Sequence, residues 1–128
     1  MRPQSAKAKG RRFQQWVRDA MLKAAIWLEE DDIRSTSMGA SGEDLLLSPA
    51  ARRVYPISVE CKNQEALSIW KAMAQTEAHA EEHGTTPVLF FKRNRSSEYA
   101  CVPAEYLIEL MVGRVRTRAS TSEQKGQH

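Results

Sequence analysis

Residues 44–62, DLLLSPAARRVYPISVECK, are the stretch that decides how this chain folds. The stretch contains two extended runs, the acid-led leucine run Asp44–Leu47 and the run Val54–Val59. The residues between them, Ser48–Arg53, begin with a Ser-Pro pair, which is typical of a turn. Two runs of strand length on either side of a turn predict a β-hairpin or two adjacent strands.

Charged residues stand at the ends of both predicted strands. Asp44 begins the first strand, and Glu60, Cys61 and Lys62 end the second. Because side chains alternate faces along a strand, Glu60 and Lys62 point the same way and Cys61 points the opposite way. If Asp44 pairs near Glu60, two carboxylates and an ammonium converge at one sheet edge. Adjacent carboxylates repel unless a cation lies between them. Hard oxygen ligands suit Mg²⁺ or Mn²⁺, which is the arrangement that a metal-dependent phosphodiesterase needs.

Size and composition indicate one globular domain. The chain has 128 residues, of which 41% are hydrophobic and 27% charged. No apolar run approaches the roughly 20 residues that span a bilayer, and the basic N-terminus lacks the apolar core of a signal peptide. We therefore expect a cytoplasmic protein with no membrane partner. Cys61 and Cys101 lie in predicted strands and are expected to be buried thiols rather than a disulfide.

The positive charge of the chain is unevenly placed. A net charge of +3 alone is ordinary solubilising charge, but basic residues cluster within residues 2–18, 92–95 and 114–118. Such clustering favours a polyanionic partner.

The rest of the chain alternates between helix and strand patterns. In chain order, we expect a helix over residues 10–30, strands over 33–37, 44–47 and 54–62, a helix over 65–83, strands over 87–91 and 98–102, and a helix over 103–113. The apolar face of the second helix is expected at Leu67, Ile69, Trp70, Met73, Ala74, Ala78 and Ala80. Residues 1–9 are expected to be a flexible basic arm, 10–113 a single domain, and 114–128 a polar, disordered tail. The order predicts an α/β fold with a mixed sheet flanked by helices.

Two other groups of metal-binding residue types are less informative. The acid run Glu29–Asp32 is expected to be a solvated surface at the end of the first helix. His79 and His83 are four residues apart, so they share one helical face and could bind a metal. Because no HExxH motif surrounds them, we interpret both histidines as surface residues.

An acid-x-Lys triplet is weak by itself, and Glu123-Gln124-Lys125 also fits it. The triplet Glu60-Cys61-Lys62 differs in its context, because it closes an apolar strand, follows a strand that an acid begins, and precedes a helix. This context resembles the PD-(D/E)XK nuclease superfamily, whose restriction-endonuclease-like core has the order αβββαβ. Asp44 matches the first motif acid, and Glu60 and Lys62 match the second motif. The resemblance covers about residues 10–102.

Within that superfamily, the chain is most similar to the Holliday junction resolvases of archaea and phages. The similarity rests on Lys9-Gly10, on Arg34-Ser35 with the Gly/Ser loop 38–42, and on segments 67–75 and 87–93. The chain departs from the pattern at Glu43, which replaces a proline.

A second departure is Gln14, which replaces a glutamate that commonly helps bind metal. The resemblance keeps Gln14 as a site residue that orients a water. It also implies a site role for Gln75, which is similar to a glutamine of RecB-like nucleases; a helix-surface amide is the equal alternative.

The resemblance implies metal-assisted hydrolysis of DNA. Asp44, Glu60 and the main-chain carbonyl of Cys61 would hold Mg²⁺, for which Mn²⁺ would substitute, and Lys62 would orient or deprotonate the attacking water. The expected DNA contacts are Lys9, Arg11, Arg12, Arg34, Ser37, Ser41, Lys92 and Arg93.

Resolvases of this kind imply a homodimer that acts on four-way junctions in recombination and repair, in a prokaryote or a phage-infected cell. Apolar residues of the second helix and Phe90-Phe91 are expected at the dimer interface. Two alternatives stay open. One is a repair, recombination or restriction-like nuclease that acts on other DNA. The other is a catalytically impaired DNA-binding protein on the same fold, which Gln14 favours.

Overall fold

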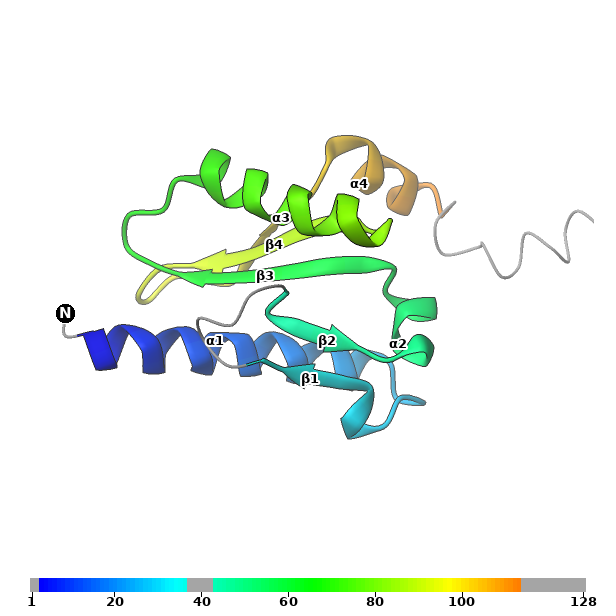
Figure 1. The fold of residues 1–128 in the computed structure, drawn as a ribbon, viewed down its shortest axis with the longest axis horizontal. Coiled ribbons are helices and arrows are strands. Elements are labelled where there is room, and N and C mark those ends of the chain that lie inside the picture. Colours follow the sequence, from blue (N-terminus) through cyan, green and yellow to red (C-terminus); the bar gives the residue numbers. More distant parts are fainter. Residues whose placement is uncertain (1–2, 37–42, 114–128) are drawn as a thin grey trace, which may run out of the picture.

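The computed structural model describes residues 3–36 and 43–113, and of Pro3 and Gln4 only the backbone. The expected loop 38–42, the residues Ser37 and Ser41, and the tail 114–128 lie outside the described residues. The elements in chain order are α1 (Pro3–Ala24), the short 3₁₀ helix η1 (Glu30–Asp32), β1 (Ile33–Ser35), β2 (Leu45–Leu47), α2 (Pro49–Val54), β3 (Ile57–Asn63), α3 (Ile69–His83), β4 (Thr86–Lys92), β5 (Tyr99–Cys101) and α4 (Ala104–Met111) (Figure 1).

The central sheet is mixed, as predicted. Strand β3 pairs in parallel with β4, and β4 pairs antiparallel with β5, in the order β3-β4-β5. Strands β1 and β2 form a separate antiparallel pair. The main-chain N–H of Asp44 donates to Val59 O at 3.1 Å, and this bond joins the start of β2 to β3. The prediction of an α/β fold with a mixed sheet flanked by helices is confirmed.

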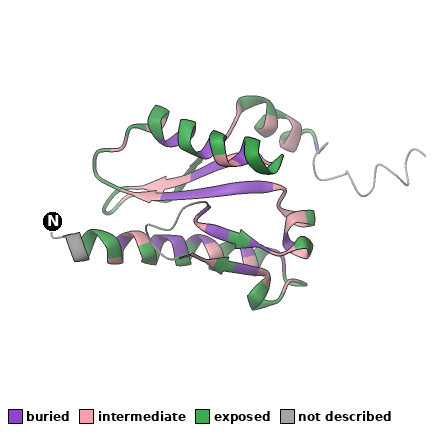
Figure 2. Cartoon of the chain, viewed as in Figure 1, coloured by how far each residue is buried: buried purple, intermediate pink, exposed green. Residues whose placement is uncertain are grey.

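Helices α1 and α3 cover opposite faces of the central sheet (Figure 1). On the α1 side, Phe13 and Val17 pack against Val59 and Cys61 of β3 in the larger core cluster. On the α3 side, a smaller cluster joins the helix to Leu89 of β4. Strand β3 is buried from its first residue, Ile57, to Cys61, because both of its faces are covered (Figure 2). Polar groups on this strand are therefore held away from bulk water.

The first helix is longer at its start and shorter at its end than predicted. It begins at Pro3 rather than at Gly10, so residues 3–9, expected to be a flexible arm, are helical. Alanine, lysine and glutamine in this segment are good helix formers, and Lys9 Nζ donates to Asn94 Oδ1 at 2.9 Å, which ties the segment to the β4–β5 turn. The helix ends at Ala24 rather than at Glu30.

The predicted turn at Ser48–Arg53 is a helix, α2. Ser48 is its N-cap, since its side chain accepts a hydrogen bond of 3.1 Å from the N–H of Ala51, and Pro49 takes the first helical position. The β-hairpin alternative is therefore wrong. Strands β2 and β3 also belong to different sheets, and the hydrogen bond from Asp44 to Val59 joins them only at the start of β2. Strand β3 begins at Ile57 rather than at Val54, because α2 uses Val54.

The later elements follow the prediction with shifted ends. Helix α3 begins at Ile69 rather than at Glu65, with Ser68 as N-cap, and ends as predicted before Gly84, whose φ is 66°. Its buried face differs from the predicted one. Ala72, Met73, Thr76 and Ala80 are buried, whereas Trp70, Ala74 and Ala78 are exposed.

Helix α4 begins at Ala104, with Pro103 as N-cap rather than first residue. Both cysteines are free thiols, as predicted. Among the described helices, none combines the length and the apolar character that crossing a bilayer requires.

Candidate active site

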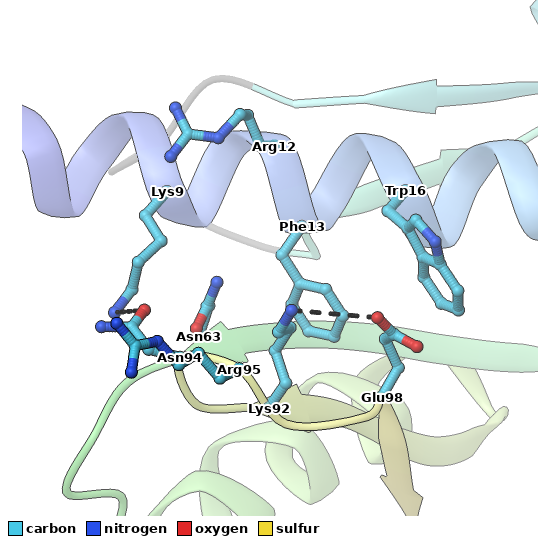
Figure 3. Close-up of a pocket in the computed structure, with 9 residues that line it drawn as sticks. All are labelled: Lys9, Arg12, Phe13, Trp16, Asn63, Lys92, Asn94, Arg95 and Glu98. Atoms are coloured by element: carbon cyan, nitrogen blue, oxygen red, sulfur yellow. Dashed lines mark hydrogen bonds and ion pairs between the residues drawn. The ribbon is translucent and has the colours of Figure 1, made fainter.

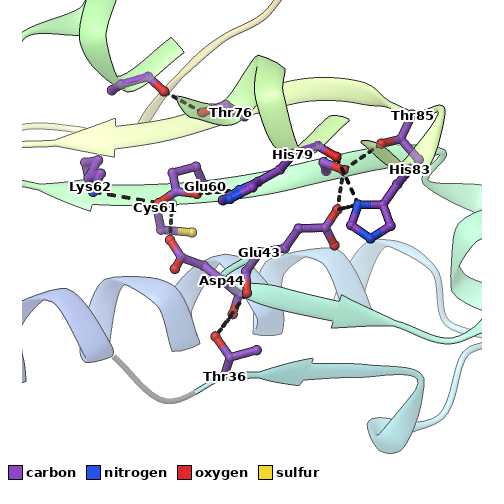
Figure 4. A network of polar contacts seen from close by, with 12 residues as sticks. Thr36, Glu43, Asp44, Glu60, Cys61, Lys62, Thr76, His79, His83 and Thr85 are labelled. Atoms are coloured by element: carbon purple, nitrogen blue, oxygen red, sulfur yellow. Dashed lines mark hydrogen bonds and ion pairs between the residues drawn. The ribbon is translucent and has the colours of Figure 1, made fainter. Parts of the chain in front are cut away.

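Asp44 lies where β2 meets the free edge of β3. Its main-chain N–H bonds to Val59, and its carboxylate Oδ2 accepts a hydrogen bond of 2.7 Å from the N–H of Cys61. The main chain thus holds the residue on both sides, and its carboxylate lies beside the strand that carries Glu60 and Lys62 (Figure 4). This is the convergence that the sequence predicted for the two strands.

Gln14 of α1 fixes the backbone of Asp44 from below the sheet. The side chain is 1% exposed, and its Nε2 donates to Thr36 O at 3.0 Å and to the main-chain oxygen of Asp44. Two carbonyl acceptors require an amide donor, which a glutamate could not supply. The described contacts of Gln14 are therefore with the backbone that positions the aspartate.

Glu60 lies at the centre of the site. It is 4% exposed, and its carboxylate faces α3 (Figure 4). Lys62 Nζ is 3.7 Å from Glu60 Oε1, and His79 Nδ1 is 3.7 Å from Glu60 Oε2. The structure therefore brings together Asp44, Glu60 and Lys62, and it adds a histidine that the sequence interpretation had placed on the surface.

The pKa values of Asp44 and Glu60 are both raised, which indicates that nearby positive charge does not balance the two carboxylates. The pKa of Glu60 is raised to about 7, mainly by burial and also by the nearby Asp44, while Lys62 opposes the rise. Burial also raises the pKa of Asp44, against the hydrogen bond from Cys61 and the charges of Lys62 and His79. A cation between the carboxylates would relieve this repulsion.

The donor set of the site fits a hard divalent cation. Two carboxylates supply oxygen ligands, and Glu60 Oε2 is buried with no hydrogen-bond partner in the described part of the chain. The described residues hold no group of three or more His, Cys, Asp or Glu side chains that could bind a metal, so an ion between these carboxylates would need further ligands of another kind, such as main-chain oxygens or water. The Cys61 thiol is no ligand candidate, because burial raises its pKa and its side chain belongs to the core.

The sequence analysis does not identify a second buried carboxylate, that of Glu43, and notes the residue only because it replaces a proline. Its side chain is 3% exposed and accepts hydrogen bonds from Ser58 Oγ and, at 3.2 Å, from Arg52. His83 Nδ1 is 3.5 Å from its Oε1. The side chains of β3 alternate between faces, so Ser58, which bonds to Glu43, lies on the same face as Glu60. This alternation is the sequence signal that could have linked Glu43 to Glu60.

The two histidines of α3 differ in how far the surface interpretation holds. His83 is exposed, as predicted, although it reaches Glu43. His79 is wrongly predicted, because its side chain is only 21% exposed and its Nδ1 is buried beside Glu60. Both residues face the sheet because they are one helical turn apart on α3.

The remaining predicted site residues that the structure describes lie away from this centre, and of these Lys9 is buried. Gln75 is exposed on α3, and Arg11 and Arg34 are exposed. Lys9, Arg12 and Lys92 line one cavity, and Arg93 lines another at the same end of the sheet.

Phe90 and Phe91, expected at a dimer interface, are half-buried and pack against the two core clusters, one on each face of β4. Their role at a dimer interface stays a prediction.

Comparison with known proteins supports a family assignment. A family model described as "Phage putative PDDEXK endonuclease" matches residues 5–127. Searches of curated proteins and of solved structures find no match.

Proposed function

Because the chain belongs to the phage PDDEXK endonuclease family, we propose that it hydrolyses DNA phosphodiester bonds with a divalent metal ion held by Asp44 and Glu60. The observation that carries this proposal is that a buried carboxylate with a raised pKa lies beside a second carboxylate and an ammonium. Glu60 has a pKa raised to about 7, Asp44 contributes to that rise, and Lys62 Nζ is 3.7 Å away.

The chain's own residues would divide the work as follows. Asp44 and Glu60, with the main-chain carbonyl of Cys61, would hold Mg²⁺ or Mn²⁺. When bound, such an ion polarises the scissile phosphate and stabilises charge on the leaving oxygen. Lys62 would orient the attacking water, accept its proton or offset the negative charge of the phosphorane-like transition state. Burial of the site strengthens each of these interactions, because the low local dielectric screens them weakly.

We also propose that the substrate is a branched DNA, with the four-way junction as the leading candidate, and that the active form is a homodimer. The support is the resemblance to junction resolvases and the basic side chains at the end of the sheet nearest Lys62. The rival substrate is linear duplex. The rival role of a DNA-binding protein without activity gains no support from Gln14, since this residue holds the Asp44 backbone.

The test is incubation of the purified protein with a labelled four-way junction and a linear duplex of the same sequence, in Mg²⁺, Mn²⁺ or EDTA. Cutting that needs the metal and prefers the junction is the expected result. Asp44→Asn should abolish cutting and leave junction binding intact. Cutting of the duplex alone would remove the resolvase role, and wild-type cutting by Asp44→Asn would show that the centre is wrongly assigned.

A further inference from the structure

A cavity of about 330 Å³ lies between α1 and the end of the sheet where β3 and the β4–β5 turn meet (Figure 3). Asn63, which lines it, directly follows Lys62 and pairs with Lys92 in the β3–β4 register. The cavity therefore opens one residue away from the candidate catalytic ammonium. Its size suits a ligand such as one nucleotide, and it is too small to receive a DNA duplex.

The lining of this cavity is strongly positive. It contains the basic residues Lys9, Arg12, Lys92 and Arg95 and one acid, Glu98. The acid lies 3.8 Å from Lys92, whereas the structure gives Arg12 and Arg95 no ion-pair partner among residues 3–36 and 43–113. Lys9 is buried and donates to the neutral amide of Asn94. Uncompensated guanidinium groups at a cavity favour a phosphate, which they contact with paired N–H donors.

An aromatic ring completes the lining. Trp16 is 46% exposed, and its indole is stacked on Phe13 with ring centroids 6.2 Å apart and an interplanar angle of 21°. Phe13 is itself 4% exposed and belongs to the core, so Trp16 is backed by a fixed ring. A half-exposed indole on a rigid support, beside several cations, is the kind of platform on which an unpaired base stacks.

The opposite wall of the cavity is also held in place. Arg95 has a φ of 63°, a conformation that non-glycine residues rarely adopt, and it lies in the β4–β5 turn. Ser96 fixes this turn, because its N–H donates to Arg93 O at 3.2 Å and its Oγ accepts from the N–H of Arg93 at 3.0 Å. The guanidinium group is thus carried by a turn of defined geometry rather than by a loose loop.

We propose that this cavity receives one unpaired nucleotide of the DNA substrate, with its base on Trp16 and its phosphate on Arg95. The inference rests on the proposed function for its ligand and deepens it. A base must leave its stack to reach the indole, so the cavity selects DNA that carries an unpaired or distorted strand beside the cleavage centre. Continuous duplex would contact only the rim.

The test measures DNA binding by fluorescence anisotropy in EDTA, where no cutting occurs. Wild type, Trp16→Ala and the control Trp27→Ala are compared on a single strand, a fork and a duplex; Trp27 is 68% exposed and lies beyond the end of α1. We expect Trp16→Ala to lose about tenfold in affinity for the single strand and the fork and little for the duplex, with Trp27→Ala near wild type. Equal affinities of Trp16→Ala and wild type for the single strand would overturn the inference.

Two further measurements keep the result unambiguous. Arg95→Ala, which removes an exposed side chain, should lower the salt dependence of single-strand binding by about 0.7 in log–log slope if Arg95 contacts a phosphate, and an unchanged slope would count against the cavity. This variant decides the question if Trp16→Ala fails to fold. A free deoxynucleotide that competes as well as a single strand does, per site, would overturn the claim that the cavity takes a strand.

Binding and cutting fail separately in this design. If wild type cuts no DNA but Trp16→Ala selectively loses the unpaired strands, the nuclease proposal fails and the cavity assignment stands. If wild type cuts and Trp16→Ala binds every DNA normally, the cavity assignment alone fails.

Discussion

His79 Nδ1 lies 3.7 Å from Glu60 Oε2, and within the described ranges neither buried atom has a hydrogen-bond partner. The separation is too long for a direct hydrogen bond. His83, one turn further along α3, has its Nδ1 3.5 Å from Glu43 Oε1, but there Glu43 Oε1 accepts from Ser58 Oγ and His83 Nδ1 contacts His79 O at 2.9 Å. Helix α3 therefore presents one histidine to each buried carboxylate.

We predict that His79 supports the metal-binding carboxylate and that His83 does not. His79→Ala should weaken Mn²⁺ binding by about tenfold, the lower range for groups that orient metal ligands, because Glu60 loses its neighbour. His83→Ala is the matched control and should change the affinity less than about twofold on the same argument. Isothermal titration calorimetry measures both, and equal losses in the two variants would contradict the assignment.

The raised pKa of Glu60 predicts a pH-dependent stability in the absence of metal. Because the pKa of Glu60 in the folded protein, about 7, lies above the ordinary glutamate value of 4.5, the folded protein favours the protonated acid. The stability that protonated Glu60 contributes to the folded state is fully present below pH 4.5 and is lost as the pH rises through about 7. Glu60→Gln mimics the protonated form, so it should be more stable than wild type at about pH 8, by at most about 3 kcal/mol, and similar at about pH 5.

Urea unfolding in EDTA at both pH values measures this difference. Glu77→Gln on the exposed face of α3 is the control and should change stability by less than about 0.5 kcal/mol. Saturating Mg²⁺ should reverse the order of wild type and Glu60→Gln, since only the carboxylate binds the ion tightly. Identical unfolding curves of wild type and Glu60→Gln at high pH would mean that the ionised Glu60 carboxylate does not destabilise the fold.

Gln14 gives a prediction in which a single atom changes. Gln14→Glu places a carboxylate against the main-chain oxygens of Thr36 and Asp44, so both lose a donor in a buried site. The variant should lose about 2 kcal/mol or more of unfolding free energy at neutral pH. Gln15→Glu is the matched control, because Gln15 is exposed on the same helix, and it should lose about 0.5 kcal/mol at most. A fully stable Gln14→Glu would show that the site accepts the acid seen in the resembling family.

The strand that carries Glu60, Cys61 and Lys62 could be predicted from sequence because its signals are close in the chain. Its apolar pattern lies within the strand itself, and the acid before β2, Asp44, is 16 residues before Glu60. Helix α2 could not be predicted with the same rules, because Ser48-Pro49 begins a turn and a capped helix equally well. The choice depends on packing, as Ala51 is fully buried under β2.

The contact partners of His79, Glu43 and Gln14 depend on long-range packing, which the sequence patterns did not predict. His79 meets Glu60 only because α3 crosses back over the parallel β3–β4 pair, and Glu43 becomes buried only where β2 approaches β3. The acceptors of Gln14 are main-chain oxygens brought together by long-range contacts. Sequence identifies residue types, whereas these roles come from tertiary geometry. The catalytic roles of Asp44, Glu60 and Lys62 stay predictions.

Lys62 should matter for the reaction and not for holding the ion. Its ammonium lies beside Glu60 and carries charge that could meet the reacting phosphate, but it cannot ligate a cation while protonated. Lys62→Gln should therefore keep Mn²⁺ affinity within a few-fold and lower kcat by about a hundredfold or more. Lys71→Gln, an exposed lysine on α3, should leave both unchanged. Calorimetry and single-turnover cleavage separate the two quantities. A Lys62→Gln variant that cuts at the wild-type rate would remove the lysine from the mechanism, and one that fails only to bind metal would recast it as a partner that holds Glu60 in place.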